Sequence, residues 1–191
     1  MARPREFEID KALDGATEVF WRQGYDGAAL PDLLAGMGIS RGSFYKAFAD
    51  KRTVYLACLD RYEETSIAKA VGLLTDGRNG SGGDRIAALF GSVVRSARID
   101  RRGCFLTNAA IDRAPFDPDV EQRVLAMMER LAAGFAVAVK DGQAAIDGDR
   151  ARQLGEMLVT YYVGLQVTAR AGARRDELQR SIDRILALIA T

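Results

Sequence analysis

Apolar residues recur at helical spacing along most of the chain, and no segment shows a strand pattern. The first apolar stripe runs from Ile9 to Phe20 and stops at Gly24, which suits the C-terminal cap of a helix. A second, shorter stripe covers residues 30–37, where Pro31 is acceptable in the first turn and Gly38 marks the end. The pattern therefore predicts two N-terminal helices separated by a short connection.

Two further helix starts follow closely. Ser40 is a suitable N-cap for a helix of about two turns over residues 41–48. Asp50 is a suitable N-cap for a long helix that begins at Lys51 and continues toward Leu74. The glycines and short polar residues of "TDGRNGSGGDR", which starts at Thr75, predict a flexible surface loop.

The remaining sequence predicts five more helices. One follows Asp84, a short one covers residues 104–111, and a long one starts where Asp117 precedes Pro118. The last two have apolar stripes over residues 154–165 and 178–189. The predicted fold is all-α with nine helices: an N-terminal three-helix domain over residues 1–50 and a C-terminal helical bundle over residues 51–191.

Composition indicates an ordinary soluble globular protein, with 48% hydrophobic and 28% charged residues in a chain of 191. No apolar run approaches the length of a membrane span, and "MARPREFEID" lacks the apolar core of a signal peptide. We therefore expect a cytoplasmic protein. Cys58 and Cys104 form neither a disulfide framework nor a metal-ligand pair, so both thiols are expected to be reduced.

The absence of histidine narrows the classes of function. It removes the usual general base and the commonest metal ligand. An enzyme would have to rely on scattered carboxylates or on Cys104 alone. We therefore expect a protein that is not an enzyme and that holds no metal or cofactor.

Charge is concentrated rather than abundant, since the net charge of the whole chain is only +1. Attraction to nucleic acid must therefore come from local clustering. Between Gly38 and Arg52 four cations stand against the single anion Asp50, a local balance of +3. Arg3 and Arg5 add a second basic element, for which a tail that contacts nothing is an equally good interpretation.

The predicted short helices over 30–37 and 41–48, joined through Gly38, indicate a helix-turn-helix motif. If Ile39, Phe44 and Phe48 are buried, the opposite face of the second helix would meet base edges and phosphates in a major groove. Lys51 and the amides at the start of the following helix suit a phosphate contact. A packing corner with merely solvated charges is the less favoured alternative. The predicted DNA-binding residues are Arg41, Gly42, Ser43, Tyr45, Lys46 and Lys51, together with Arg3 and Arg5.

The stretch "ALDGATEVFWRQGYDGAALPDLLAGMGISRGSFYKAFADKRTVY" resembles the N-terminal signature of the TetR family of one-component transcriptional regulators. The similarity includes the Gly-Tyr pair after the first helix, the Gly-Ile-Ser turn, Phe-Tyr in the recognition helix and the Phe-x-x-Lys opening of the fourth helix. It implies a homodimer that binds a near-palindromic double-stranded DNA operator. It also implies that the divergent C-terminal helices form a small-molecule effector pocket and the dimer interface.

The resemblance assigns roles within the predicted DNA-binding set. Tyr45 and Lys51 would contact phosphates, and Arg41, Ser43 and Lys46 would read bases. The sequence departs from the family pattern at Ala28, where a threonine often caps the second helix and touches phosphate. It also departs at Leu34, which replaces a small residue. The first departure is expected to weaken anchoring to the DNA backbone.

The effector is expected to be an apolar or aromatic small molecule, because the larger side chains of the C-terminal helices are aromatic or methionine with few polar groups. Asn108 and Gln166 are the candidates for a specific hydrogen bond. Most residues of this kind are core residues in helical proteins, so both interpretations stay open. The predicted ligand-binding residues are Phe90, Phe105, Asn108, Met127, Phe135, Tyr161, Tyr162 and Gln166.

Cys104 lies near a predicted helix N-terminus after Arg101 and Arg102, where positive potential favours the thiolate. A thiol sensor of oxidants or electrophiles is therefore an alternative function, although a small buried residue is the favoured interpretation. A helical protein-interaction module is a further alternative, but it leaves residues 38–52 unexplained.

The last two predicted helices have apolar stripes wide enough to cover both the core and a partner, which predicts a four-helix dimer interface. Interfaces of this kind bury on the order of 2,000 Å² or more. The favoured function is a repressor that a small-molecule effector releases from its operator. The predicted interface residues are Leu158, Tyr161, Leu165, Leu178, Ile182, Ile185 and Ile189.

Overall fold

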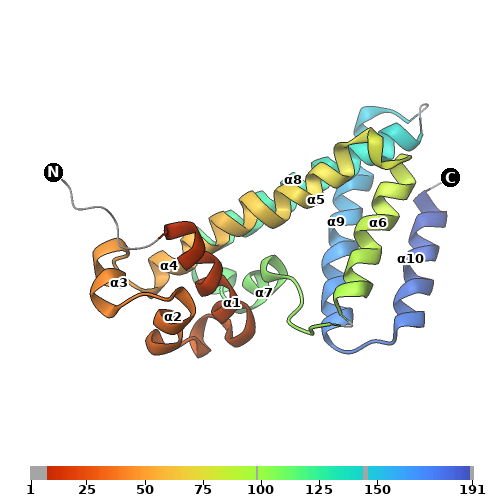
Figure 1. The fold of residues 1–191 in the computed structure, drawn as a ribbon. Coiled ribbons are helices and arrows are strands. Elements are labelled where there is room, and N and C mark those ends of the chain that lie inside the picture. The colour runs from red at the N-terminus through yellow and green to blue at the C-terminus, as the bar shows by residue number, and fades with distance from the viewer. Residues whose placement is uncertain (1–7, 98, 144–145, 190–191) are drawn as a thin grey trace. The chain divides into compact units, whose positions relative to one another are not determined.

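The computed structural model describes residues 8–97, 99–143 and 146–189, and within these ranges every regular element is helical (Figure 1). The chain divides into two compact units. Unit 1 comprises Met1–Thr65 and Asn108–Val124, and unit 2 comprises Ser66–Thr107 and Leu125–Thr191. The predicted division at residue 50 concerns function and stays a prediction.

Unit 1 contains four N-terminal helices, of which α1 packs against both α2 and α4. Its core includes Ala16, Phe20, Leu33 and Leu59, none of which is more than 1% exposed. Residues 108–124 complete the unit. They comprise the rest of α7, a 3-10 turn and the first turns of α8. The elements are α1 (Ile9–Gly27), α2 (Leu30–Met37), α3 (Arg41–Ala47), α4 (Lys51–Tyr62), α7 (Phe105–Asp112), the 3-10 turn Ala114–Phe116 and α8 (Pro118–Gly142).

Unit 2 is built around α6, which packs against α5, α9 and α10 (Figure 1). Apolar residues of α6, α8 and α9 fill its centre, including Phe90, Phe135 and Leu158, which are fully buried. None of the described helices combines the length and apolar character needed to cross a membrane. The elements are α5 (Ala68–Thr75), the 3-10 turn Gly77–Asn79, α6 (Gly82–Ser96), α9 (Gly148–Arg170) and α10 (Arg175–Ile189).

The long helix predicted from Lys51 is present, but a π-helical turn over Glu63–Ile67 separates α4 from α5. If α4, the π-turn and α5 are counted as one helix, the described residues contain the nine helices that the sequence predicts, apart from two 3-10 turns. The π-turn accommodates one extra residue without breaking the helix, so the spacing of apolar residues did not reveal it.

The prediction for the start of α6 was wrong by a few residues. The helix begins at Gly82 rather than after Asp84, because Ser81 and Asp84 form a reciprocal capping box. The Ser81 side chain accepts a hydrogen bond from the Asp84 amide, and the Asp84 carboxylate accepts one from the Ser81 amide. The cap allows two glycines in the first helical turn, although glycine-rich sequence favours a loop.

Candidate DNA-binding interface

Gly38 ends α2 in the left-handed conformation, with φ 66° and ψ 32°. Its amide donates to the Ala35 carbonyl, and the Ile39 amide donates to the Leu34 carbonyl. A residue with a Cβ atom is strained in this conformation, whereas glycine adopts it freely. The predicted role of Gly38 as the helix-ending turn residue is therefore confirmed.

Helix α3 buries one face and exposes the other. The Ser40 side chain caps it by accepting a hydrogen bond from the Ser43 amide at 3.1 Å. Phe44 and Phe48 are 1% and 7% exposed, and their ring centroids lie 5.9 Å apart. Both predicted anchors are therefore in place, while Ile39 is only half-buried.

The outward face of α3 carries most of the predicted recognition side chains. Arg41, Gly42 and Lys46 are exposed, and Tyr45 is 55% exposed. The Tyr45 ring packs edge-on against Phe44 with centroids 5.3 Å apart, which holds it beside the buried anchor. This face therefore presents two cations and a phenol hydroxyl on a supported helix.

Ser43 is less accessible than these neighbours. It is half-buried, and its hydroxyl oxygen accepts a hydrogen bond from the Ser40 hydroxyl at 3.0 Å. The Ser43 hydroxyl keeps its own hydrogen available to donate to a base, because it only accepts in this bond. Its assignment as a base reader stays a prediction.

The start of α4 combines an anionic cap with a cation. The Asp50 carboxylate accepts hydrogen bonds from the Thr53 amide at 2.7 Å and the Thr53 hydroxyl at 2.9 Å. These bonds hold the pKa of Asp50 below its usual value. Because Asp50 already occupies the Thr53 amide, Lys51 is the better candidate for a phosphate contact here.

Lys51 is held in place by Tyr25. Its ammonium nitrogen lies 4.8 Å from the centroid of the Tyr25 ring and donates to the Asp26 carbonyl at 3.5 Å. The Arg113 guanidinium lies 4.4 Å from the same centroid. Cations over an aromatic face are attracted by the ring quadrupole. The Gly-Tyr pair after the first helix thus supplies a platform for the predicted phosphate-binding lysine.

Arg52 differs from Lys51 because its charge is committed within the protein. Its guanidinium makes a bidentate ion pair with the buried Asp117, at 2.7 and 2.8 Å, and also contacts Asp119. Hydrogen bonds from Arg52 hold the pKa of Asp117 at about 2. Arg113 also pairs with Asp117, at 3.5 Å. Arg52 therefore cannot be counted among the free cations of residues 38–52, as the local balance of +3 had assumed.

Tyr25, Arg113 and Asp117 were missed as supporting residues. Only Tyr25 had a local signal, through the Gly-Tyr pair. The Arg52 and Asp117 side chains meet across 65 positions of sequence, and no periodicity indicates such a pair. Arg3 and Arg5 lie outside the described residues.

The connection between α1 and α2 bears on the expected loss of backbone anchoring. Ala28 is fully buried, and the N-cap of α2 is Ala29, which makes no side-chain cap hydrogen bond. The first amides of α2 thus lack the cap that a serine or threonine would supply.

Comparison with known proteins agrees with this geometry. The profile of the family described as bacterial regulatory proteins, tetR family, matches residues 12–58. An uncharacterized HTH-type transcriptional regulator, YezE of Bacillus subtilis, is 30% identical over 99% of this chain and 100% of its own length. The chain belongs to the TetR family. It is a DNA-binding transcriptional regulator.

Two further relatives extend the comparison. The HTH-type transcriptional repressor ComR of Escherichia coli is 27% identical over 93% of this chain and 87% of its own length. A structure of a cysteine-substituted TetR family regulator, CifR, with 26-base-pair double-strand operator DNA has a TM-score of 0.80. It is 29% identical, with 97% of this chain and 98% of that chain covered. TetR family proteins are dimeric and bind small-molecule effectors.

The residues predicted to bind an effector form, in part, a packed aromatic cluster in unit 2. Phe90 lies 5.6 Å from Phe135 and 5.0 Å from Tyr161 between ring centroids, and Tyr162 stacks at 6.4 Å. The Gln166 amide donates to the Tyr162 hydroxyl at 2.9 Å. These contacts show that the rings pack against one another within unit 2, and a ligand-binding role for the cluster stays a prediction.

The other predicted effector residues are buried as well. Phe105 and Met127 are at most 1% exposed, and Asn108, which belongs to unit 1, is 7% exposed. Cys104 is also buried, in agreement with the favoured interpretation of it as a packing residue. Among the described residues, no group of three or more Cys, Asp or Glu side chains is placed to hold a metal ion.

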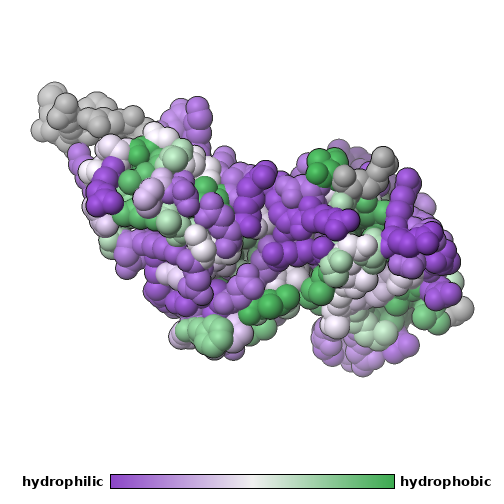
Figure 2. All heavy atoms as spheres, turned by 90° about the horizontal axis from the view of Figure 1, so that it is seen from below, coloured by the Kyte–Doolittle hydropathy of each residue, from purple (hydrophilic) through white to green (hydrophobic). Residues whose placement is uncertain are grey.

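The predicted dimer residues fall into two groups. Four of them are buried within the single chain: Leu158, Leu165, Leu178 and Ile182. Tyr161, Ile185 and Ile189 are half-buried and available in part to a partner. On the same two helices, Met157, Val167 and Leu188 are exposed apolar residues that the prediction did not include. Figure 2 shows apolar patches separated by hydrophilic residues on the face it displays.

Proposed function

We propose that this TetR family regulator is a homodimeric repressor that leaves its operator when a small molecule binds in unit 2. The observation that carries the DNA-binding part is the outward face of α3, with Arg41, Tyr45 and Lys46 exposed above the buried Phe44. Repression is supported by the names of three relatives: ComR, DhaR and BdcR are repressors, whereas FasR is an activator.

The contacts divide by chemistry. Tyr45 and Lys51 bind phosphates, since a phenol hydroxyl donates one hydrogen bond and an ammonium group is a mobile point charge. Arg41, Ser43 and Lys46 read base edges in the major groove, where guanidinium and ammonium groups meet guanine O6 and N7. Lys51 is pre-positioned by the Tyr25 ring.

Release follows from a shift between two populations of the dimer. The two recognition helices must lie about 34 Å apart to enter successive major grooves, and an effector favours a state with a different spacing. Helix α4 carries Lys51 and continues through the π-turn into α5 of unit 2, so one helical run joins the phosphate contact to the effector unit. A coupling of about 1–3 kcal/mol changes operator affinity by roughly 5- to 150-fold.

Repression is tested with a reporter gene placed behind an operator selected by the purified protein. Expression of the wild-type chain should lower reporter output, and Arg41→Ala should restore it. Arg22→Ala is the matched control, because Arg22 is an exposed arginine on α1, where it pairs with Glu18 at 3.6 Å. A rise in reporter output with the wild-type chain would assign it to activation instead.

A further inference from the structure

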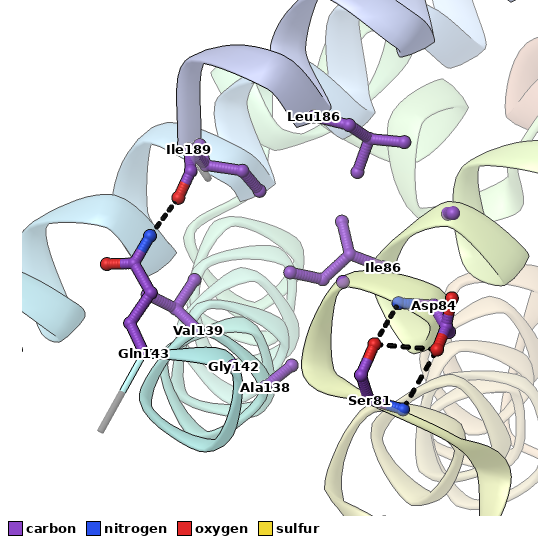
Figure 3. Close-up of a pocket in the computed structure, with 11 residues that line it drawn as sticks. Ser81, Asp84, Ile86, Ala138, Val139, Gly142, Gln143, Leu186 and Ile189 are labelled. Carbon is purple, nitrogen blue, oxygen red and sulfur yellow. Dashed lines mark hydrogen bonds between the residues drawn. The ribbon is translucent and has the colours of Figure 1, made fainter. Parts of the chain in front are cut away.

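A cavity of about 390 Å³ lies within unit 2, between the first turns of α6 and the last turns of α8 and α10 (Figure 3). None of the eight residues predicted to bind an effector lines it. Its walls are aliphatic, and polar groups stand at Ser81, Asp84 and Gln143. The apolar lining residues are Ile86, Ala87, Ala138, Val139, Leu186 and Ile189.

Three contacts hold the helices around this cavity. At Gly82 a Cβ atom would lie 1.7 Å from the Ala138 carbonyl oxygen, so α6 and α8 touch backbone to backbone. The side-chain amide of Gln143, which directly follows α8, donates to the Ile189 carbonyl of α10. The third contact belongs to Arg85.

Arg85 is 1% exposed and carries a charge inside the wall of unit 2. Its guanidinium donates to the Leu74 carbonyl at 2.7 Å and pairs with Asp141 at 2.7 Å. A buried charge of this kind is stable only when it is fully paired, so the bonds resist loss. We call these two interactions of Arg85, with Leu74 and with Asp141, the Arg85 clasp. They join α6 to the end of α5 and to α8 beside the cavity.

The lining selects for an aliphatic molecule. Its apolar side chains are methyl and branched alkyl groups, and none of the described lining residues is aromatic. In Figure 3, Ile86 and Leu186 point toward one another across the space. The volume falls within the range of about 300–1,000 Å³ that is usual for small-molecule sites. Such walls offer dispersion contacts to an alkyl chain and no aromatic partner for a ring to stack on.

The polar groups select against an anion. Asp84 is ionised at neutral pH, because hydrogen bonds from Ser81 hold its pKa below the usual value. No described lining residue carries a positive charge, and the nearby Arg85 is used by Leu74 and Asp141. A carboxylate in this cavity would lie beside the ionised Asp84 with no cation among the described lining residues, so like-charge repulsion disfavours it. An uncharged head group avoids this repulsion.

We propose that this cavity binds an uncharged aliphatic molecule with a single polar end, such as a medium-chain alcohol, and that it is the effector site of the regulator. The second part rests on the proposed function. A ligand that widens the cavity would displace the helices that the Arg85 clasp joins. Through its hydrogen bond to Leu74, this clasp holds the last turn of α5. That turn ends the helical run that begins at Lys51.

Binding is tested by isothermal titration of the full chain with octanol and with octanoate. Octanol should bind, and octanoate should bind at least about 10-fold more weakly. Ala87→Phe, which adds a ring on the half-buried wall, should abolish octanol binding. Ala88→Phe is the matched control, because Ala88 is the exposed next residue and does not line the cavity.

Folding of each variant is checked by circular dichroism. If Ala87→Phe does not fold, Leu186→Gln at the half-buried wall carries the test and should weaken octanol binding. The proposed site is overturned if octanol fails to bind, if octanoate binds equally well, or if the folded wall variant binds like the wild type.

The regulatory part is tested with the selected operator. Octanol should lower operator affinity at least about 5-fold for the wild type and for Ala88→Phe, but not for Ala87→Phe. If octanol binds the cavity and operator affinity stays the same, the effector role is wrong while the proposed repressor stands. If no operator is selected at all, the proposed function fails, and titration alone still decides whether the cavity binds alcohols.

Discussion

At the scale of single residues, the cations near the recognition helix differ in how they are held. Lys46 is exposed on α3, and Lys51 lies over the Tyr25 ring. Arg52 forms ion pairs with Asp117 and Asp119. A cation that is already oriented loses less conformational entropy when it meets a phosphate. Lys51 is therefore expected to contribute more to operator affinity than its half-buried position suggests.

The contribution of Lys51 can be measured from the dependence of operator affinity on salt concentration. Operator affinity should fall steeply between about 50 and 200 mM salt, because bound phosphates release counterions. Lys51→Ala should reduce the slope of log affinity against log salt by about 1 per subunit. Lys11→Ala, at an exposed site on α1, should leave the slope unchanged. A flat salt response of the wild type, or equal slopes for both variants, would contradict the phosphate contact.

Asp117 links protonation to stability. Its pKa of about 2 in the folded protein lies below its ordinary value of 3.8, so its ion pair with Arg52 stabilises the protein above about pH 4. That contribution is lost as the pH falls from about 4 toward 2. Asp117→Asn should lower the free energy of unfolding at pH 7 by about 2 kcal/mol.

Urea denaturation at pH 7 and pH 3 measures this difference. The loss caused by Asp117→Asn should shrink at pH 3, because the unfolded wild-type chain binds a proton at Asp117 there while the folded chain holds this carboxylate mostly ionised. Asp149→Asn is the matched control, since the Asp149 side chain is 87% exposed and should change stability little at either pH. An effect of Asp117→Asn that is equal at both values would show that the ion pair is not its cause.

At the scale of elements, α2 lacks a side-chain cap. Ala29 has the extended conformation of an N-cap but offers no hydrogen-bond acceptor from its side chain. Ala29→Ser supplies the hydroxyl and should raise the free energy of unfolding by about 1 kcal/mol. Thermal denaturation should show a higher Tm, whereas Ala35→Ser, at an exposed site within the same helix, should not raise it. A lower Tm for Ala29→Ser would show that α2 begins differently.

Local chemistry made most of the elements predictable. Gly38, Ser40 and Asp50 act through hydrogen bonds to residues at most four positions away, so their roles can be read from the sequence. The Arg52–Asp117 pair depends on packing between distant segments, which periodicity does not report. The start of α6 was misjudged because glycine content outweighed the Ser81 and Asp84 cap.

At the scale of the whole molecule, dimerisation is expected to bury exposed apolar residues of α9 and α10, and a charge introduced among them should oppose it. Met157 on α9 and Leu188 on α10 are 55% and 72% exposed in the single chain. Leu188→Glu puts a charge where a partner would bury it, so it should convert the dimer to monomers in sedimentation analysis. Ile99→Glu is the control, because Ile99 is 89% exposed and lies on neither helix. A dimer that survives Leu188→Glu would place the interface elsewhere.

The cavity proposed as the effector site could not be predicted from the sequence, for a physical reason. Phe90, Phe135 and Tyr162 have the size and polarity of ligand-binding residues, yet their rings fill one another's space. The cavity proposed above lies among small and aliphatic residues such as Ala87 and Ala138, whose types give no signal, and a ligand-binding role for the aromatic residues stays a prediction. Empty space depends on how three helices meet, and composition does not encode it.

The measurement that tests the central claim most directly is selection of DNA sites from a random pool by the purified protein. Tyr45→Ala combined with Lys46→Ala serves as the loss-of-contact variant, and Lys11→Ala as the control. The account predicts enrichment of a near-palindromic site by the wild type and by the control, and no enrichment by the double variant. Equal enrichment by the double variant, or none by a folded wild-type dimer, would contradict the assignment of α3 as the recognition helix.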